Sequence, residues 1–450
     1  MEHILEKLNE IIWGVPVLIM ILLIGILYSV RTGFIQFRLF PKACEEFIAS
    51  FRHKADGISG YRALCTALAA TVGTGNIVGV AGAIAIGGPG VVFWMWICAI
   101  LGMVIKFAEV TLAMNFREKN PTGDWVGGPM YIIQNGLHPK YKCLAAIYAF
   151  FGVVASFGIG NATQINAIMG GIQMLSDLAG RPIGMVATLI ISLLIGTLVV
   201  LIFRNGANGI GSWAEKLVPP ASVIYILLTL WILGSNIKQI PDVLKLIVTS
   251  AFSPSTATCG IVSSALISLR VGASRGVFTN EAGMGTASIA HSGAMGVDSV
   301  QQGLLGTIEV IFDTIVMCTL TAFAILCSGV SIPYGSDPGI HLTLYAFSEE
   351  LGRWSSYLII ALVCIFAFAT VLGWGLYGMR CMEYLFGIGT ENIFIALQFC
   401  AVLAGSFIGT SGVWLFSEIV NGLMAIPNLI ALLLLLPIFL RETQNYMIKA

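Results

Sequence analysis

An apolar run at 63–86 is interrupted by the stretch Val72-Gly73-Thr74-Gly75-Asn76. A second apolar run, at 264–296, is interrupted by Phe278-Thr279-Asn280-Glu281-Ala282-Gly283-Met284-Gly285. Glycine in a helix interior costs about 1 kcal/mol per residue relative to alanine. Two Gly-x-Gly breaks at matching places are therefore not explained by helix stability. They indicate two helices that unwind because a ligand or a close contact requires it.

The composition around these breaks is typical of a membrane protein. The 450 residues are 57% hydrophobic and 10% charged, and mean hydropathy is +0.91, whereas a soluble domain carries about 25% charged residues. Continuous apolar runs of roughly 20 residues match the length needed to cross a bilayer as helices. The 23 basic and 23 acidic residues balance, so there is no basic surface for nucleic acid. The ten cysteines show no metal-ligand spacing.

We expect an all-α polytopic membrane protein with eleven transmembrane helices. The expected spans are 14–30, 63–86, 91–115, 143–169, 183–203, 217–235, 264–296, 302–328, 355–378, 392–409 and 413–438. Lys and Arg concentrate in the connections 31–62 and 116–142, which lie on one side of the membrane in this count. The positive-inside rule makes that side cytoplasmic. In a cell (inner or cytoplasmic) membrane the N-terminus is then outside and the C-terminus is in the cytoplasm.

The spans form two sets of five with opposite topology, as in inverted-repeat transporters. The expected division is an N-terminal helix and basic loop at 1–62, a first repeat at 63–236, an extracellular connection at 237–263, a second repeat at 264–438 and a cytoplasmic tail at 439–450. Each repeat begins with a broken helix. The free N–H groups of one half-helix can hold a carboxylate, and the freed carbonyls can coordinate a cation or an ammonium. An amino acid zwitterion fits such a pair.

The sequence resembles the alanine or glycine:cation symporter family. The resemblance covers nearly the whole chain and rests on both breaks and on the stretch Gly87-Gly88-Pro89-Gly90-Val91-Val92-Phe93-Trp94-Met95-Trp96. The breaks also resemble those of sodium-coupled amino acid transporters with the LeuT fold. The resemblance implies a LeuT-like 5+5 inverted repeat with one extra N-terminal helix. It further implies sodium- or proton-coupled uptake of a small neutral amino acid such as alanine or glycine, with no organic cofactor and no obligate protein partner.

The resemblance also implies the residues of a site. The first break would contribute backbone amides for the substrate carboxylate through Thr71, Gly73, Thr74, Gly75 and Asn76. The second break would contribute carbonyls for the amino group through Phe278, Thr279 and the backbone up to Gly283. The fourth and ninth spans would complete the pocket with Asn161, Gln164 and Trp374. Interhelical hydrogen bonding or packing is the alternative for these last three.

Two sodium sites follow from the same resemblance. One would use the oxygens of Thr71, Asn76 and Thr279. The other would use the carbonyls of Ala69, Val72 and Ala367 with the hydroxyl of Thr370. Hard cations prefer such oxygen ligands. Val371 follows Thr370 where the LeuT-like transporters place a second hydroxyl, which leaves proton coupling open.

Charged residues inside the spans are functional candidates because burying them in a bilayer is costly. We interpret Lys106 and Glu109, three residues apart in the third span, as a mutually neutralising pair. Glu281 lies in the second break, where it would bond freed backbone or relay a proton; Glu309 and Asp313 lie in the eighth span. Their roles stay open.

Two other classes of function fit the sequence less well. A channel needs rings of carbonyls or charges around a continuous pore, whereas two broken helices of opposite topology in one chain favour a carrier. A membrane enzyme needs a nucleophile, a base and oxyanion donors together, and the sequence provides no such set. We therefore expect a carrier and not an enzyme.

Overall fold

The protein is almost entirely helical. The computed structural model describes residues 7–8, 12, 16–52, 57–252, 265–336, 338–407 and 410–449. Within that part, seven helices are long and apolar enough to cross a membrane, and the bent pair Gly60–Thr71 and Gly75–Gly87 adds an eighth span. Pro16–Arg31 and Glu391–Gly405 are shorter apolar helices. The all-helical, multi-pass architecture is thus confirmed, while the count of eleven spans stays a prediction.

The elements up to the middle of the chain are α2 (Pro16–Arg31), α3 (Ile35–Arg38), α4 (Phe40–Ser50), α5 (Gly60–Thr71), η1 (Gly75–Gly79), α6 (Val80–Gly87), α7 (Val91–Phe116), β1 (Glu118–Lys119), β2 (Trp125–Val126), α8 (Pro129–Gly136), η2 (Pro139–Tyr141), α9 (Lys142–Phe157), η3 (Gly158–Ala162), α10 (Thr163–Leu178), α11 (Met185–Phe203) and α12 (Gly206–Ser235). The two short strands pair antiparallel, with Glu118 opposite Val126 and Lys119 opposite Trp125. They form a small hairpin between α7 and α8.

The remaining elements are η4 (Ile237–Gln239), α13 (Ile240–Phe252), α14 (Ala265–Asn280), α15 (Thr286–His291), α16 (Ser299–Val310), η5 (Ile311–Cys318), α17 (Thr319–Cys327), α18 (His341–Leu351), α19 (Trp354–Phe386), α20 (Glu391–Gly405) and α21 (Thr410–Lys449). The connection expected at 237–263 therefore contains a helix, α13, and its residues 253–264 lie outside the described part.

Both expected interruptions are confirmed. The first begins after Thr71, where Val72 is extended (φ −78°, ψ 95°), and the two half-helices around it are bent by 49°. The second lies between α14 and α15 and contains positive φ angles at Glu281 (54°), Gly283 (91°) and Gly285 (75°). Glycine adopts such angles without steric cost. Glu281 is the residue for which this conformation needs support from neighbouring groups.

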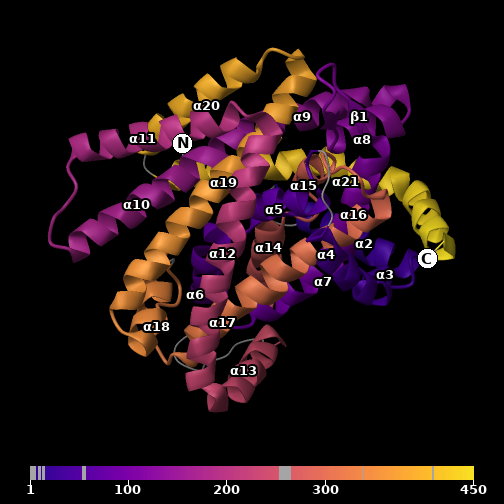
Figure 1. Cartoon of the computed structure of the whole chain (residues 1–450). Coiled ribbons are helices and arrows are strands. Elements are labelled where there is room, and N and C mark those ends of the chain that lie inside the picture. Colours follow the sequence, from indigo (N-terminus) through magenta and orange to yellow (C-terminus); the bar gives the residue numbers. More distant parts are fainter. Residues whose placement is uncertain are drawn as a thin grey trace.

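The broken helices lie in the middle of the molecule. Figure 1 shows α5, α14 and α15 near its centre, and α5 packs against α12, α15 and α19. Close packing depends on small residues: a Cβ at Gly373 of α19 would lie 2.8 Å from the backbone nitrogen of Ala70 in α5. Such close backbone approach is typical of membrane helices. It brings the ninth expected span against the first broken helix.

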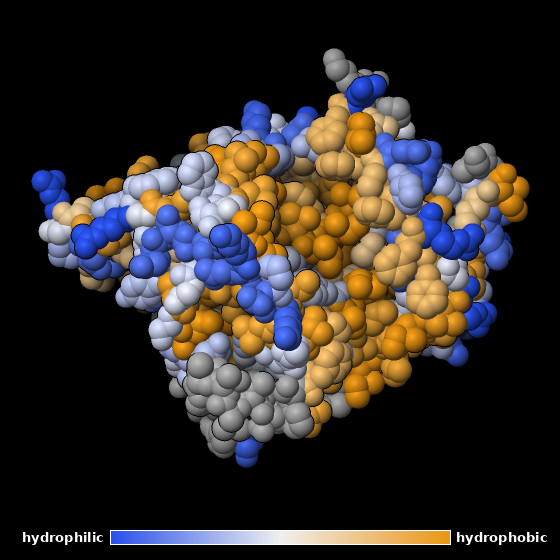
Figure 2. Space-filling model, turned by 90° about the horizontal axis from the view of Figure 1, so that it is seen from below, coloured by the Kyte–Doolittle hydropathy of each residue, from blue (hydrophilic) through white to orange (hydrophobic). Residues whose placement is uncertain are grey.

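Large apolar side chains cover much of the outer surface. Figure 2 shows broad apolar areas on one face of the molecule. On α11 and α12 the exposed side chains include Leu194 (66%), Leu227 (61%) and Trp231 (68%). An aqueous protein rarely exposes apolar patches on this scale. The surface is that of a protein surrounded by lipid.

Candidate functional site

A cavity of about 560 Å³ lies where the two broken helices meet. The first break contributes Thr74 and Gly75 to its wall, and α14 contributes Phe278 immediately before the second break. Thr163 and Asn166 of α10 line it as well. Residues about 200 positions apart in the sequence therefore border one space. The two broken helices therefore meet at one cavity, as expected.

Two glycines let the first break approach its neighbours. A Cβ at Gly73 would lie 2.8 Å from Thr370 Oγ1 of α19. A Cβ at Gly75 would lie 3.2 Å from Thr279 Cγ2 of α14. A Cβ at Gly73 would force a shift of one of the two groups, and a Cβ at Gly75 would require its neighbour to move by a few tenths of an ångström. The first break thus touches both the second broken helix and α19.

Asn76 is held in one orientation by Asp313. Its Nδ2 donates to Asp313 Oδ1 at 2.6 Å and to the Asp313 carbonyl at 3.1 Å. An amide that donates on one side presents its oxygen on the other, and Asn76 Oδ1 accepts from the Gly73 N–H at 2.9 Å. The Gly73 amide is therefore not free for a carboxylate, contrary to our expectation, because a neighbouring side chain already satisfies it. Thr74 and Gly75 are the residues of this break that line the cavity.

Three of the four side chains expected to ligate sodium are threonines with a shared geometry. Each donates its hydroxyl hydrogen to a carbonyl in its own helix, namely Thr71 to Ala67, Thr279 to Gly276 and Thr370 to Phe366. A hydroxyl that has donated its hydrogen keeps its oxygen lone pairs. All three side chains are buried. Oxygens of this kind are the ligands that a hard cation such as sodium prefers.

The second break is stabilised by a buried carboxylate from α7. Glu109 Oε1 accepts from the backbone N–H groups of Gly283 (2.9 Å) and Gly285 (3.0 Å). Asn428 Nδ2 donates to Glu109 Oε1 at 2.6 Å and to the Gly283 carbonyl at 2.9 Å. The freed amides therefore have a partner within the chain. Gly283 does not line the cavity, and its carbonyl, which was expected to face the substrate amino group, accepts from Asn428 instead.

The expected pairing of Lys106 with Glu109 is only part of the arrangement, since their charges attract each other but each side chain bonds a partner on another element. Lys106 Nζ bonds Glu309 Oε1 of α16 at 3.3 Å. Glu309 Oε2 lies 3.3 Å from His291 Nε2, at the end of α15. A spacing of three residues places two side chains on one face of a helix, but neighbouring helices offered each of them a partner. Both side chains are fully buried with those partners.

Comparison with known proteins decides the family. The model of the sodium:alanine symporter family matches residues 1–450. The chain belongs to this family. The sodium/alanine symporter AgcS of Methanococcus maripaludis is 38% identical over 98% of this chain and 96% of its own length. The probable sodium/glutamine symporter GlnT of Bacillus subtilis is 35% identical over 99% of this chain and 91% of its own.

A solved structure supports the same conclusion for the fold. MhsT in complex with L-phenylalanine superposes with a TM-score of 0.55 at 14% identity, over 87% of this chain and 99% of that chain. The fold is thus that of the LeuT-like transporters. Members of the family are sodium-coupled amino acid symporters in membranes and not enzymes. The resemblance inferred from the two breaks is confirmed.

In the symporter, Glu281 supports the strained second break. Its Oε1 accepts from Trp374 Nε1 at 3.0 Å, and its Oε2 accepts from Thr286 Oγ1 at 2.5 Å. These bonds hold the residue whose φ is positive. Trp374 itself packs at Gly160, where a Cβ would lie 2.4 Å from Trp374 Cβ. Trp374 does not line the cavity, and it joins α19 to the second break.

The two amide side chains of the fourth expected span bond different parts of the protein. Gln164 Oε1 accepts from Thr74 Oγ1 at 3.4 Å, so Gln164 reaches the first break. Asn161 Nδ2 instead donates to the carbonyl (3.1 Å) and side chain of Gln398 in α20. For Asn161 the alternative of interhelical bonding is what the symporter has. Asn161 does not line the cavity.

The structure adds charged residues that our sequence reasoning did not assign to the site. Arg275 and Glu418 line the cavity, with Nη1 and Oε1 3.7 Å apart. The Arg275 guanidinium carbon lies 5.9 Å from the Phe278 ring centroid. The spacing of three residues between Arg275 and Phe278 was visible in the sequence and places both on one helix face. Glu418, about 140 residues later, had no such signal.

Proposed function

We propose that this symporter couples inward movement of sodium to uptake of a small neutral amino acid, such as alanine or glycine, by alternating access around a midplane site. The observation that carries the proposal is the single cavity bordered by both breaks through Thr74, Gly75 and Phe278. A zwitterion has its two charges on neighbouring groups. Opposed half-helix ends provide partners for both of them.

The substrate carboxylate is assigned to the backbone amides of the first break at Thr74 and Gly75, and the amino group to carbonyls near Phe278 and Thr279. Gln164 fixes Thr74 through its hydrogen bond. The close approach of Gly75 to Thr279 supports this assignment, because it brings the two breaks side by side. A side chain at Gly75 would occupy the space of the carboxylate.

Sodium is assigned to the oxygens beside this cavity. The first site uses Thr71, Asn76 and Thr279, and Asp313 aims the Asn76 oxygen through its two bonds to Nδ2. The second uses the carbonyls of Ala69, Val72 and Ala367 with the Thr370 hydroxyl. Support for the second site comes from the close approach of Gly73 to Thr370. Sodium held there would tie the first break to α19.

The topology completes the proposal, with the N-terminus outside and the C-terminus in the cytoplasm. The cavity is bordered by Met174, Gly339 and Ile340, near the ends of helices that the positive-inside rule places outside. The division at 63–236 and 264–438 into inverted repeats agrees with a broken helix at the start of each.

Uptake by the purified protein in liposomes tests the function. A panel of labelled amino acids (alanine, glycine, serine, glutamine and phenylalanine) is offered under an inward sodium gradient, an inward proton gradient or neither. The expected result is saturable uptake of alanine or glycine that the sodium gradient drives. Uptake driven by protons alone contradicts the sodium assignment, and flux without substrate saturation contradicts the carrier.

A further inference from the structure

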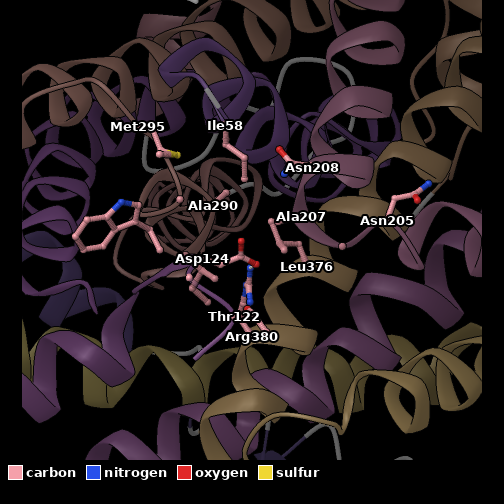
Figure 3. Close-up of a pocket in the computed structure, with 16 residues that line it drawn as sticks. Ile58, Thr122, Asp124, Asn205, Ala207, Asn208, Ala290, Met295, Leu376 and Arg380 are labelled. Atoms are coloured by element: carbon pink, nitrogen blue, oxygen red, sulfur yellow. Dashed lines mark hydrogen bonds and ion pairs between the residues drawn. The ribbon is translucent and has the colours of Figure 1, made fainter. Parts of the chain in front are cut away.

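A second cavity lies on the opposite side of the breaks. Its volume is about 280 Å³, and it is bordered by Ile58 before α5, by Ile289 and Ala290 of α15, and by Leu376 and Arg380 of α19. The wall thus includes the inner half of the second broken helix, the residues just before the first one, and the same α19 that borders the breaks. Figure 3 shows Ala290, Ala207 and Leu376 around this space.

The two cavities follow one another along the same helices. On α19, Val363 lines the first cavity, Thr370 meets the first break and Arg380 lines the second. Leu376, which also lines the second cavity, follows Thr370 by six residues, and six residues of helix advance about 9 Å, so the second cavity begins roughly that far beyond the break. It lies on the side that carries the basic connections 31–62 and 116–142. That side is cytoplasmic by the positive-inside rule.

The hairpin at 117–126 forms part of the wall of this second cavity. Thr122, Asp124 and Trp125 line it. The turn is held in shape by Asn120, whose Oδ1 accepts from the Asp124 N–H at 2.9 Å and whose N–H donates to the Asp124 carbonyl at 2.9 Å. The hairpin is therefore a preformed unit and not a loose loop.

One end of the hairpin is bonded to the segment after α15. Arg117 Nη1 donates to the carbonyls of Ser292 (2.9 Å) and Ala294 (2.5 Å). The Arg117 guanidinium carbon lies 4.3 Å from the Trp125 ring centroid, which holds it over the strand. Gly127 continues this contact, since a Cβ there would lie 2.5 Å from Ser292 Cβ.

The other end is bonded to α19. Arg380 Nη2 lies 3.2 Å from Asp124 Oδ2, and Arg380 Nη1 lies 2.5 Å from Glu383 Oε2. Asn120 Nδ2 donates to Glu383 Oε1 at 2.7 Å. Asp124 is 56% exposed, whereas Arg380 is only 8% exposed. Figure 3 shows the two side chains pointing toward each other at the cavity. The ion pair of Asp124 and Arg380 joins the exposed turn of the hairpin to a buried guanidinium group.

We propose that the 117–126 hairpin is the cytoplasmic latch of the transport cycle. While the first cavity is open, the hairpin ties α15 to α19 through Arg117 and Asp124. The amino acid leaves through the cavity of Figure 3 only when these ties break. This inference rests on the proposed function, because a latch has a purpose only in a carrier with alternating access. The bond of Trp374 to Glu281, which joins α19 to the second break, is the inner boundary of the same closed path.

The test measures access to Ala290, which is 3% exposed and lines the second cavity. Ala290→Cys is placed in an active variant whose ten native cysteines are replaced. The protein is reconstituted in liposomes, and a membrane-impermeant maleimide is added on either side. The labelling rate is compared in three further variants: Asp124→Asn, Arg117→Gln and the control Glu442→Gln. Glu442 bonds Arg441 within one helix at 3.5 Å and joins no two elements.

The expected result is faster labelling from the side of the C-terminus. Asp124→Asn should raise the rate about two- to five-fold, the range for losing a partly exposed ion pair. Arg117→Gln should raise it about tenfold, because it loses hydrogen bonds from a charged donor. Glu442→Gln should leave it unchanged. Both hairpin variants should also weaken the apparent affinity for external substrate in uptake.

Two outcomes would refute the proposal that the hairpin is a latch. One is a labelling rate in both hairpin variants equal to that of Glu442→Gln. The other is labelling that proceeds only from the side opposite the C-terminus. Absence of sodium-driven uptake in the unmodified protein would instead refute the proposed function. The labelling comparison would still decide whether the hairpin covers the cavity.

Discussion

The contact between the first break and α19 can be tested by changing two residues. A Cβ at Gly73 would lie 2.8 Å from Thr370 Oγ1 and 3.9 Å from Thr370 Cβ. Gly73→Ala therefore forces the break away from the hydroxyl, and overpacking of this kind costs about 1–3 kcal/mol. Thr370→Ala removes the hydroxyl and leaves Cβ at an ordinary contact distance. The double variant should regain most of the stability that Gly73→Ala loses.

The assay is a double-mutant cycle on thermal unfolding in detergent, with sodium-dependent uptake measured in parallel. Residues in contact show coupling of about 0.5–3 kcal/mol, whereas independent sites add. Gly79→Ala is the matched control, because Gly79 follows the same break and has nothing within 4 Å of its Cβ position. The uptake measurement distinguishes an effect on packing from an effect on sodium binding. Thr370→Ala and the double variant should both need more sodium for half-maximal uptake, although the double variant is repacked.

Two results would refute this reasoning. If Gly73→Ala is as stable as Gly79→Ala, or if the two changes add without coupling, the break does not meet α19 as described. If Thr370→Ala keeps an unchanged sodium requirement, the Thr370 hydroxyl does not ligate sodium. The first result would refute the packing of the break against α19, and the second would refute the sodium ligand. Neither result bears on the other part of the site.

Further predictions concern the cavity and the second break. Gly75→Leu should abolish uptake while the protein still inserts and elutes as a single species, because the side chain fills the space assigned to the carboxylate; uptake at the unmodified rate would exclude that assignment. Glu109→Ala should lower the free energy of unfolding by about 2–6 kcal/mol, since it leaves the amides of Gly283 and Gly285 without an acceptor. Glu109→Gln keeps a carbonyl acceptor and should be the more stable of the two in thermal unfolding; the opposite order would mean that the bonds to the break contribute little. Trp374→Phe should lower thermal stability by losing one bond to Glu281, and unchanged stability would show that the break does not need it.

The sequence was sufficient to predict the features that depend on local composition and spacing. Apolar runs of bilayer length predicted helices because the hydrocarbon core leaves a chain few other ways to bond its backbone. Gly73 and Gly75, with Gly283 and Gly285, predicted two breaks, because glycine at matching places in apolar segments is costly unless the chain must unwind there. The structure has both breaks where these residues lie.

The sequence could not predict which residue on another helix each polar side chain bonds. Helical spacing shows which residues share a face, but not which helix that face meets. Lys106 and Glu109 share a face, yet Lys106 bonds Glu309, 203 residues away, and Glu109 bonds the second break. Asn161 and Gln164 are also three residues apart, yet Asn161 bonds α20 and Gln164 bonds the first break.

The sequence alone thus determined that this is a membrane carrier with two unwound helices, because chain composition and backbone conformation are local properties. The tertiary structure decided which groups satisfy those breaks and which remain for a ligand. The Gly73 amide is used by Asn76, the Gly283 amide is used by Glu109, and Thr74 and Gly75 face the cavity. Only the packing of distant helices makes that choice, because a buried polar group bonds whichever partner the fold brings within reach.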